Sequence, residues 1–146
     1  MLGLIITGHG EFAPGMEEAV TMIAGQQNNL SSVAFRESMN LDDFQATLQR
    51  TIDEQLAESE GVIIFTDLKG GTPFNTAALL IDKQDKVKIM AGTNLPMLIE
   101  ATLMAGVLTD PEQLARQLAQ TGRENVEFVD FEALAEDPSE DEMDGI

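Results

Sequence analysis

The fold is decided by the stretch Leu2-Gly3-Leu4-Ile5-Ile6-Thr7-Gly8-His9-Gly10. Residues 2–7 form a short and nearly continuous apolar run, which is typical of a strand buried on both faces. A helical pattern follows, with Pro14 near its start and apolar residues at helical spacing as far as Gly25. A buried strand that leads into a helix is the opening of a parallel α/β sheet.

The same alternation continues along the chain. Further strands are predicted at 32–35, 61–65 and 87–91, and helices at 40–56, 73–82, 95–106 and from 109 onward. Strands separated by helices of this length imply right-handed crossovers. The sequence therefore predicts a three-layer α/β fold, with a mainly parallel four-stranded sheet and helices on both of its faces. Val126 to Phe131 is a last β-like run and the candidate for a fifth strand.

Length and composition suggest one domain followed by a tail. The chain has 146 residues, which fits a single domain that we predict over residues 1–131. Residues 132–146 contain seven acidic side chains and no basic one. Such a segment repels itself and buries little apolar surface, so it is expected to be a mobile acidic tail.

Charge and residue usage exclude several classes of function. The net charge of −18 disfavours nucleic acid and anionic membranes. It would attract a basic partner protein, although solubility alone is the simpler explanation of the acidity. The chain has no cysteine and one histidine, so the usual zinc sites cannot be built and no metal is expected. Neither a Walker A nor a dinucleotide-binding glycine pattern is present, so no cofactor is expected. Without a signal peptide or an apolar run of membrane-spanning length, the predicted location is the cytoplasm.

The only histidine, His9, lies just beyond the first predicted strand and between two glycines. Ligands of parallel sheets bind at the carboxyl ends of the strands, which is where this loop lies. A neutral imidazole is a nucleophile near neutral pH, and the glycines leave room for a bulky group beside it. On the residues alone, an ordinary histidine in a strand-to-helix turn explains the position equally well.

A second loop follows the third predicted strand and carries the pattern Asp67, then Gly70, Gly71 and Thr72 before a helix. A carboxylate at Asp67 can accept the N–H of an imidazole on the neighbouring strand and stabilise positive charge on the ring. The glycine amides, the Thr72 hydroxyl and the helix N-terminus together suit a phosphate cradle. The alternative is a Gly-Gly turn closed by a helix cap. With His9, these residues favour reversible phosphoryl transfer.

Three motifs resemble one protein family. Gly8-His9-Gly10, Asp67 with residues 70–75, and the stretch 91–98 are similar to the enzyme IIA components of the mannose family of the bacterial phosphoenolpyruvate:sugar phosphotransferase system. The resemblance runs from the first strand to about Phe131 and does not include the acidic tail.

The resemblance implies a function and a set of partners. His9 would take a phosphoryl group from the carrier protein HPr and pass it to enzyme IIB, which serves a membrane IIC/IID complex. It further implies that Asp67 bonds the other ring nitrogen, and that Thr72 with its neighbours holds the phosphoryl group. Leu68 stands where family members can carry a hydroxyl residue, so that contact would be lost. A homodimer that exchanges its last strand is also implied, with 126–131 as the strand.

Two other functions stay open at this stage. One is the phosphocarrier subunit of a dihydroxyacetone kinase system, which would use the same histidine chemistry. The other is a non-enzymatic regulatory module whose phosphorylation is sensed by other proteins. A receiver domain would need an acidic cluster after the first strand, and residues 7–10 contain none.

Overall fold

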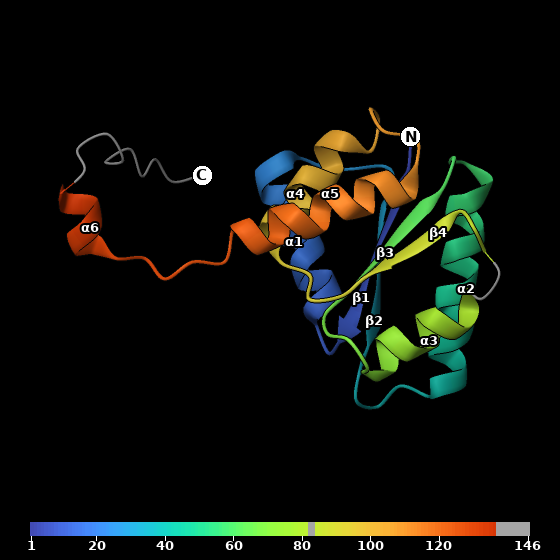
Figure 1. The fold of residues 1–146 in the computed structure, drawn as a ribbon. Helices are drawn as coiled ribbons and strands as arrows, with labels where there is room; N and C mark the ends of the chain where they lie inside the picture. Colours follow the sequence, from blue (N-terminus) through green and yellow to red (C-terminus); the bar gives the residue numbers. More distant parts are fainter. Residues whose placement is uncertain (82–83, 137–146) are drawn as a thin grey trace.

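The structure is a computed structural model, and it describes residues 1–81 and 84–136 (Figure 1). Its helices and strands follow the predicted alternation. In chain order they are β1 (Gly3–His9), α1 (Phe12–Ala24), β2 (Leu30–Phe35), α2 (Leu41–Ala57), β3 (Val62–Thr66), α3 (Thr72–Leu80), β4 (Val87–Met90), α4 (Leu95–Met104), α5 (Pro111–Glu124) and α6 (Phe131–Glu136).

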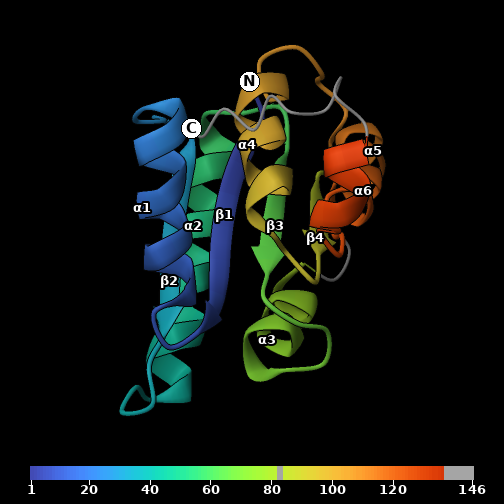
Figure 2. The ribbon, with the colours of Figure 1, turned by 90° about the vertical axis from the view of Figure 1, so that its left-hand side faces the viewer.

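The four strands form one parallel sheet in the order β2-β1-β3-β4. The two central strands, β1 and β3, are flanked on both sides, which explains why their sequences are almost uninterrupted apolar runs. In the register of the sheet, His9 pairs with Phe35 on β2, and Thr7 pairs with Thr66 on β3. The predicted parallel four-stranded α/β fold is confirmed. Its carboxyl edge gathers the ends of β1, β2 and β3 near α3 (Figure 2).

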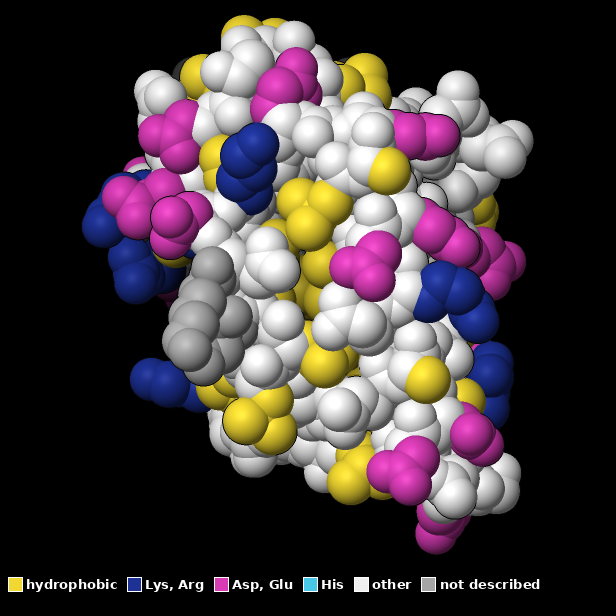
Figure 3. Space-filling view, turned by 90° about the vertical axis from the view of Figure 1, so that its right-hand side faces the viewer, with side chains coloured by type: hydrophobic (Ala, Val, Ile, Leu, Met, Phe, Trp, Pro, Cys, Tyr) yellow, Lys and Arg dark blue, Asp and Glu magenta, His cyan; other side chains and the backbone are white. Residues whose placement is uncertain are grey.

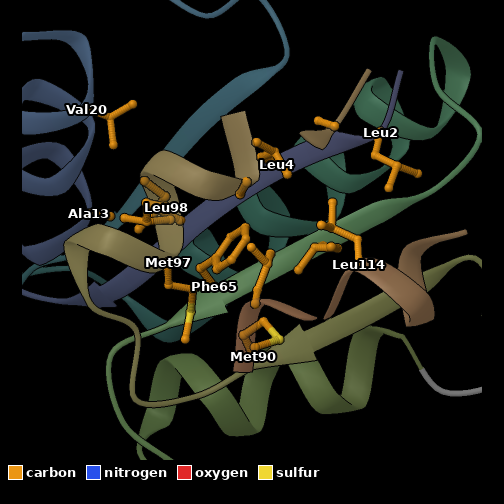
Figure 4. Close-up of a cluster of buried hydrophobic side chains, with 14 residues drawn as sticks. Leu2, Leu4, Ala13, Val20, Phe65, Met90, Met97, Leu98 and Leu114 are labelled. Carbon is orange, nitrogen blue, oxygen red and sulfur yellow. The ribbon is translucent and has the colours of Figure 1, made fainter. Parts of the chain in front are cut away.

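Helices cover both faces of the sheet, and each face has its own core. On one face, α1, α4 and α5 pack on side chains from β1, β3 and β4, including Leu4, Phe65 and Met90 (Figure 4). On the other face, α2 and α3 pack on Ile5 and Ile64 among others. Alternate residues of β1 thus point into opposite cores, as the two-residue period of a strand requires.

The helices begin at recognisable caps. The side-chain oxygens of Asn40, Asn94 and Asp110 accept hydrogen bonds from backbone amides in the first turns of α2, α4 and α5. Prolines occupy the first turns of α3, α4 and α5, where a missing N–H leaves no hydrogen bond unmade. Gly25 follows α1 with a positive φ of 82°, which ends that helix.

Two predicted boundaries differ from the structure in ways that bear on the site. β1 continues to His9, so the histidine is the last residue of the strand rather than a residue of the following loop. β2 begins at Leu30, because the chain from Asn29 onward already bonds to β1: the Leu4 amide donates to the Asn29 carbonyl.

The run from Val126 to Phe131 forms no strand within the single chain, and the predicted exchange of a fifth strand with a partner's sheet stays a prediction. Residues 126–130 belong to neither a helix nor a strand, and α6 begins at Phe131. The physical reason is the missing neighbour, since a strand needs a partner for its backbone groups and this segment leads away from the sheet (Figure 1). Of the predicted tail, residues 132–136 belong to α6, and 137–146 lie outside the described residues.

No helix in the described part of the chain combines the length and apolar character needed to cross a membrane.

Candidate active site

His9 stands at the carboxyl end of β1, where two glycines shape the backbone around it. A Cβ atom on Gly8 would lie 2.6 Å from Cδ1 of Phe12 and 2.9 Å from Cγ of Asp67, so only glycine lets these side chains approach. Gly10 has a positive φ of 58°, which turns the chain sharply into α1. The His9 side chain is 49% exposed and therefore accessible to a partner. It does not come into view on the face drawn in Figure 3, whose charged side chains lie mainly around the margin.

Asp67, the first residue beyond β3, contacts both the ring and the backbone of His9 through one carboxylate oxygen. Its Oδ2 atom lies 2.7 Å from the ring Nδ1 and 2.9 Å from the backbone nitrogen of His9. The other oxygen, Oδ1, accepts a hydrogen bond from the backbone N–H of Leu68 at 2.8 Å. A carboxylate only accepts, so the proton of the neutral imidazole resides on Nδ1 and the lone pair on Nε2.

The environment of Asp67 favours its charged form. Burial alone would raise the pKa of this carboxyl group, since its side chain is only 12% exposed. The hydrogen bonds from the His9 backbone, the His9 ring and the Leu68 backbone outweigh that effect and hold the pKa below its ordinary value. A permanent negative charge thus lies against the imidazole.

The Gly70-Gly71 turn comes up to the opposite side of the imidazole. A Cβ on Gly71 would lie 2.7 Å from Cε1 and 3.4 Å from Nε2 of His9, so the glycine leaves open the space beside the lone pair. Gly70 has a φ of 89°, and Asn75 fixes the turn by bonding the Gly70 carbonyl through its side chain and the Gly71 carbonyl through its backbone. Thr72 is the first residue of α3, whose positive N-terminal end lies here.

The structure therefore brings three of the predicted site residues, His9, Asp67 and Gly71, into close approach, while Gly70 and Thr72 flank Gly71 in the chain. Leu68 is 52% exposed and lies against the Gly71 turn, where it offers no hydroxyl, as its identity predicts. Asn94 caps α4 by accepting a hydrogen bond from the Met97 backbone amide, and its side-chain amide donates to the Gly122 carbonyl at 3.0 Å. In residues 1–81 and 84–136, no three metal-ligating side chains are grouped around a common point.

Sequence reasoning missed Phe35, which lies against the imidazole. The two rings meet edge to face, with centroids 6.2 Å apart and planes at 75°. Phe35 could have been found only from the pairing of β1 with β2, because it is the register partner of His9.

Buried threonines tie together the strand ends beneath the site. The Thr7 hydroxyl donates to the Val33 carbonyl at 2.8 Å, and the Thr66 hydroxyl donates to the Met90 carbonyl at 2.7 Å. The Thr93 hydroxyl in turn donates to the Thr66 carbonyl at 2.8 Å. These bonds connect β1 to β2 and β3 to β4 one or two residues before His9 and Asp67.

The arrangement defines a class of protein. A half-exposed imidazole, an aspartate bonded to its Nδ1 and a glycine turn at a helix N-terminus suit transient capture of a phosphoryl group. Comparison with known proteins agrees with this chemistry. Residues 3–119 match the family described as "PTS system fructose IIA component", where PTS is the phosphoenolpyruvate:sugar phosphotransferase system.

Individual relatives point the same way. The chain is 30% identical to the fructose-specific EIIA component of Bacillus subtilis, over 98% of this chain and 100% of that one. It is 33% identical to the mannose-specific EIIAB component of Escherichia coli K12, over 88% of this chain but only 39% of that longer protein. Among solved structures, EIIA from Streptococcus agalactiae superposes with a TM-score of 0.79 at 30% identity, covering 91% of this chain and 99% of that one.

The chain belongs to the mannose-type enzyme IIA family of the sugar phosphotransferase system, as the motifs predicted. It is accordingly a phosphotransferase that carries phosphoryl groups during sugar uptake, through a phosphohistidine. This function fits the comparisons better than a dihydroxyacetone kinase subunit or a regulatory module does.

Proposed function

We propose that His9 is the phosphoryl acceptor of this carrier and that Nε2 is the atom that forms the bond. The observation that carries the proposal is the 2.7 Å contact between Nδ1 of His9 and Oδ2 of Asp67. Because this contact occupies Nδ1 and its proton, the nucleophilic lone pair is left on Nε2. His9 is also the only histidine of the chain, so it is the only candidate for a phosphohistidine.

In the proposed reaction, Nε2 attacks the phosphorus of a donor phosphohistidine in line with the nitrogen that leaves. The new N–P bond forms as the donor's N–P bond breaks, and the electron pair of the broken bond stays on the donor nitrogen. His9 becomes positively charged while its Nδ1 keeps its proton. Asp67, held in its charged form, stabilises that cation as it develops. Transfer onward reverses these steps with a different nucleophile.

The Gly70-Gly71-Thr72 turn is the proposed binding site for the phosphoryl oxygens. Gly71 leaves space beside Nε2, and the N-terminus of α3 supplies backbone N–H groups and a positive dipole. The Thr72 hydroxyl is a further donor in reach of the turn. The Leu68 side chain carries no hydrogen-bond donor, so these groups would hold the three equatorial oxygens of the phosphoryl group.

HPr is the proposed donor and enzyme IIB the proposed acceptor, with an indirect link to a membrane IIC/IID complex and a cytoplasmic location. Family membership supports these assignments. The relatives' names also mention fructose, mannose and sorbose, but a carrier that receives only the phosphoryl group makes no contact with the sugar.

We also propose that residues 1–131 form one domain and that two copies of it form a homodimer. In this dimer, residues 126–131 of each chain pair with the partner's sheet. Two observations support it. β4 is an outer strand of the sheet, with one edge unpaired by the described chain. Phe128 and Val126 are 89% and 76% exposed, which is unusual for apolar side chains in a β-like pattern.

Phosphoryl uptake tests the assignment of His9. Purified protein is incubated with phosphoenolpyruvate, enzyme I and HPr, and its intact mass is followed alongside His9→Gln, which keeps a polar side chain. We expect one acid-labile phosphoryl group on the wild type and none on the variant. Discharge on adding enzyme IIB would then identify the acceptor. A variant that still gains the group, with a folded spectrum, would refute His9 as the acceptor.

A further inference from the structure

Phe35 combines two contacts that set it apart from the other aromatic side chains of the chain. It is the last residue of β2 and the register partner of His9, and its carbonyl accepts a hydrogen bond from the Gly10 amide at 2.8 Å. The backbone just after the histidine is thereby tied to Phe35. Its ring then meets the His9 imidazole edge to face, at a centroid distance of 6.2 Å.

The ring of Phe35 is itself held from below. It is half-buried and packs on the core between the sheet and α2. There it contacts Phe44, whose side chain is fully buried, with ring centroids 4.9 Å apart. A half-buried ring that packs on a fully buried one has little rotational freedom, since neighbouring atoms fill much of the surrounding volume. The Phe35 ring is therefore held in one orientation, unlike a mobile surface side chain.

His9 needs a second fixed contact because the hydrogen bond to Asp67 restrains only part of the orientation of the imidazole. The imidazole moves through two torsions, and a single hydrogen bond at Nδ1 leaves the ring free to swing about that contact. Swinging would carry Nε2 away from the Gly71 turn, which it adjoins on the other side. A second contact on the ring removes this motion, and Phe35 supplies one.

We infer that Phe35 is a positioning residue for His9, and that the Phe44-Phe35 pair sets the angle at which Nε2 meets an incoming phosphorus. The inference rests on the proposed transfer at His9 and deepens it. In-line transfer depends on the alignment of the attacking atom, and a displacement of about 1 Å can cost roughly 100-fold in rate.

The test compares Phe35→Ala and Phe35→Leu with the control Leu56→Ala. Leu56 packs on the same core but lies twelve residues beyond Phe44 on α2, about 18 Å at 1.5 Å per residue. Its loss perturbs the core without approaching His9. Phe35→Leu retains most of the apolar volume and so guards against a variant that fails to fold. Because the chain has a single histidine, isotope-labelled histidine reports on His9 alone.

Two readouts are made on each protein: ring chemical shifts and relaxation of labelled His9 by NMR, and single-turnover phosphoryl transfer from phospho-HPr. We expect Phe35→Ala to increase ring motion and to slow transfer about 10- to 100-fold, Phe35→Leu to have a smaller effect in the same direction, and Leu56→Ala to change neither. His9 signals or transfer rates in the Phe35 variants that match those of Leu56→Ala would overturn the inference. If the wild type took up no phosphoryl group, the proposed function would fail, while the NMR comparison would still decide the positioning role.

Discussion

Replacing Gly71 by alanine adds one methyl group at the side of the imidazole where the phosphoryl group is proposed to bind. The φ of Gly71 is −79°, a value that alanine adopts without strain. The new Cβ would lie 2.7 Å from Cε1 of His9, whereas carbon atoms in contact prefer about 3.5 Å or more. The ring must therefore retreat by about 0.8 Å, or the turn must move by as much.

This shift should change the rate of phosphoryl transfer more than the free energy of unfolding. The Nδ1–Oδ2 contact of 2.7 Å leaves little room for a retreat, so Nε2 is displaced or the hydrogen bond lengthens. A displacement of this size predicts a loss of roughly 10- to 100-fold in the transfer rate. As the residue before α3, alanine caps less well than glycine, but it also reduces the freedom of the unfolded chain. We expect these two effects to leave the free energy of unfolding within about 1 kcal/mol of the wild type.

Single-turnover transfer from phospho-HPr measures the rate, and denaturant unfolding measures the stability. Gly15→Ala is the matched control, because Gly15 lies within α1 and a Cβ there has nothing within 4 Å. We expect it to stabilise the helix by about 0.5–1 kcal/mol and to leave transfer unchanged. Transfer by Gly71→Ala within about threefold of the control would refute the placement of the phosphoryl group beside Gly71.

Four further outcomes are expected. Asp67→Asn should fold and should slow transfer by about 100-fold or more, because the amide no longer balances the imidazolium; a rate near that of the wild type would contradict this role. The same carboxylate makes stability depend on pH. Its lowered folded-state pKa gives stability that is complete above the ordinary value of 3.8 and is lost as pH falls through the folded-state value, so acid unfolding curves of wild type and Asp67→Asn should converge at low pH. Leu48→Ala should cost about 2–5 kcal/mol in denaturant unfolding, since Leu48 is fully buried between α2 and the sheet, and a smaller loss would indicate that the core collapses around the cavity. Phe128→Glu should shift the sedimentation mass from two chains to one, whereas Met22→Glu, on an equally exposed part of α1, should not; a wild-type mass of one chain would sink the dimer proposal.

Much of the fold could be predicted because the apolar composition of the two central strands indicates that they are buried. The apolar runs at Leu4 to Ile6 and Val62 to Phe65 have no polar face, which indicates helices on both sides. The approach of His9 to Asp67 followed from the same logic, because parallel strands end at one edge. The atoms that meet, Nδ1 and Oδ2, could not be predicted, since they depend on the register between β1 and β3.

Other features could not be predicted from local sequence patterns, because they depend on which strands pair in the sheet. Phe35 became a neighbour of His9 only through the placement of β2 beside β1, a choice made by the whole sheet. The valine and phenylalanine residues of 126–131 have the propensity of a strand, but propensity without an adjacent strand leaves the backbone unpaired. The extension of β1 to His9 likewise reflects pairing with Phe35 rather than anything in the Gly8-His9-Gly10 motif.

The buried hydroxyl bonds of Thr7 and Thr66 have a kinetic consequence. The Thr7 hydroxyl holds the end of β1 to β2, and the Thr66 hydroxyl holds the end of β3 to β4, while β1 and β3 pair directly in the sheet. The backbones that carry His9 and Asp67 therefore cannot move apart without opening the sheet ladder, and such openings belong to the slow, high-energy fluctuations of a domain. In the proposed function, the acceptor site is thus preassembled before a donor arrives, and no rearrangement of the sheet has to precede transfer.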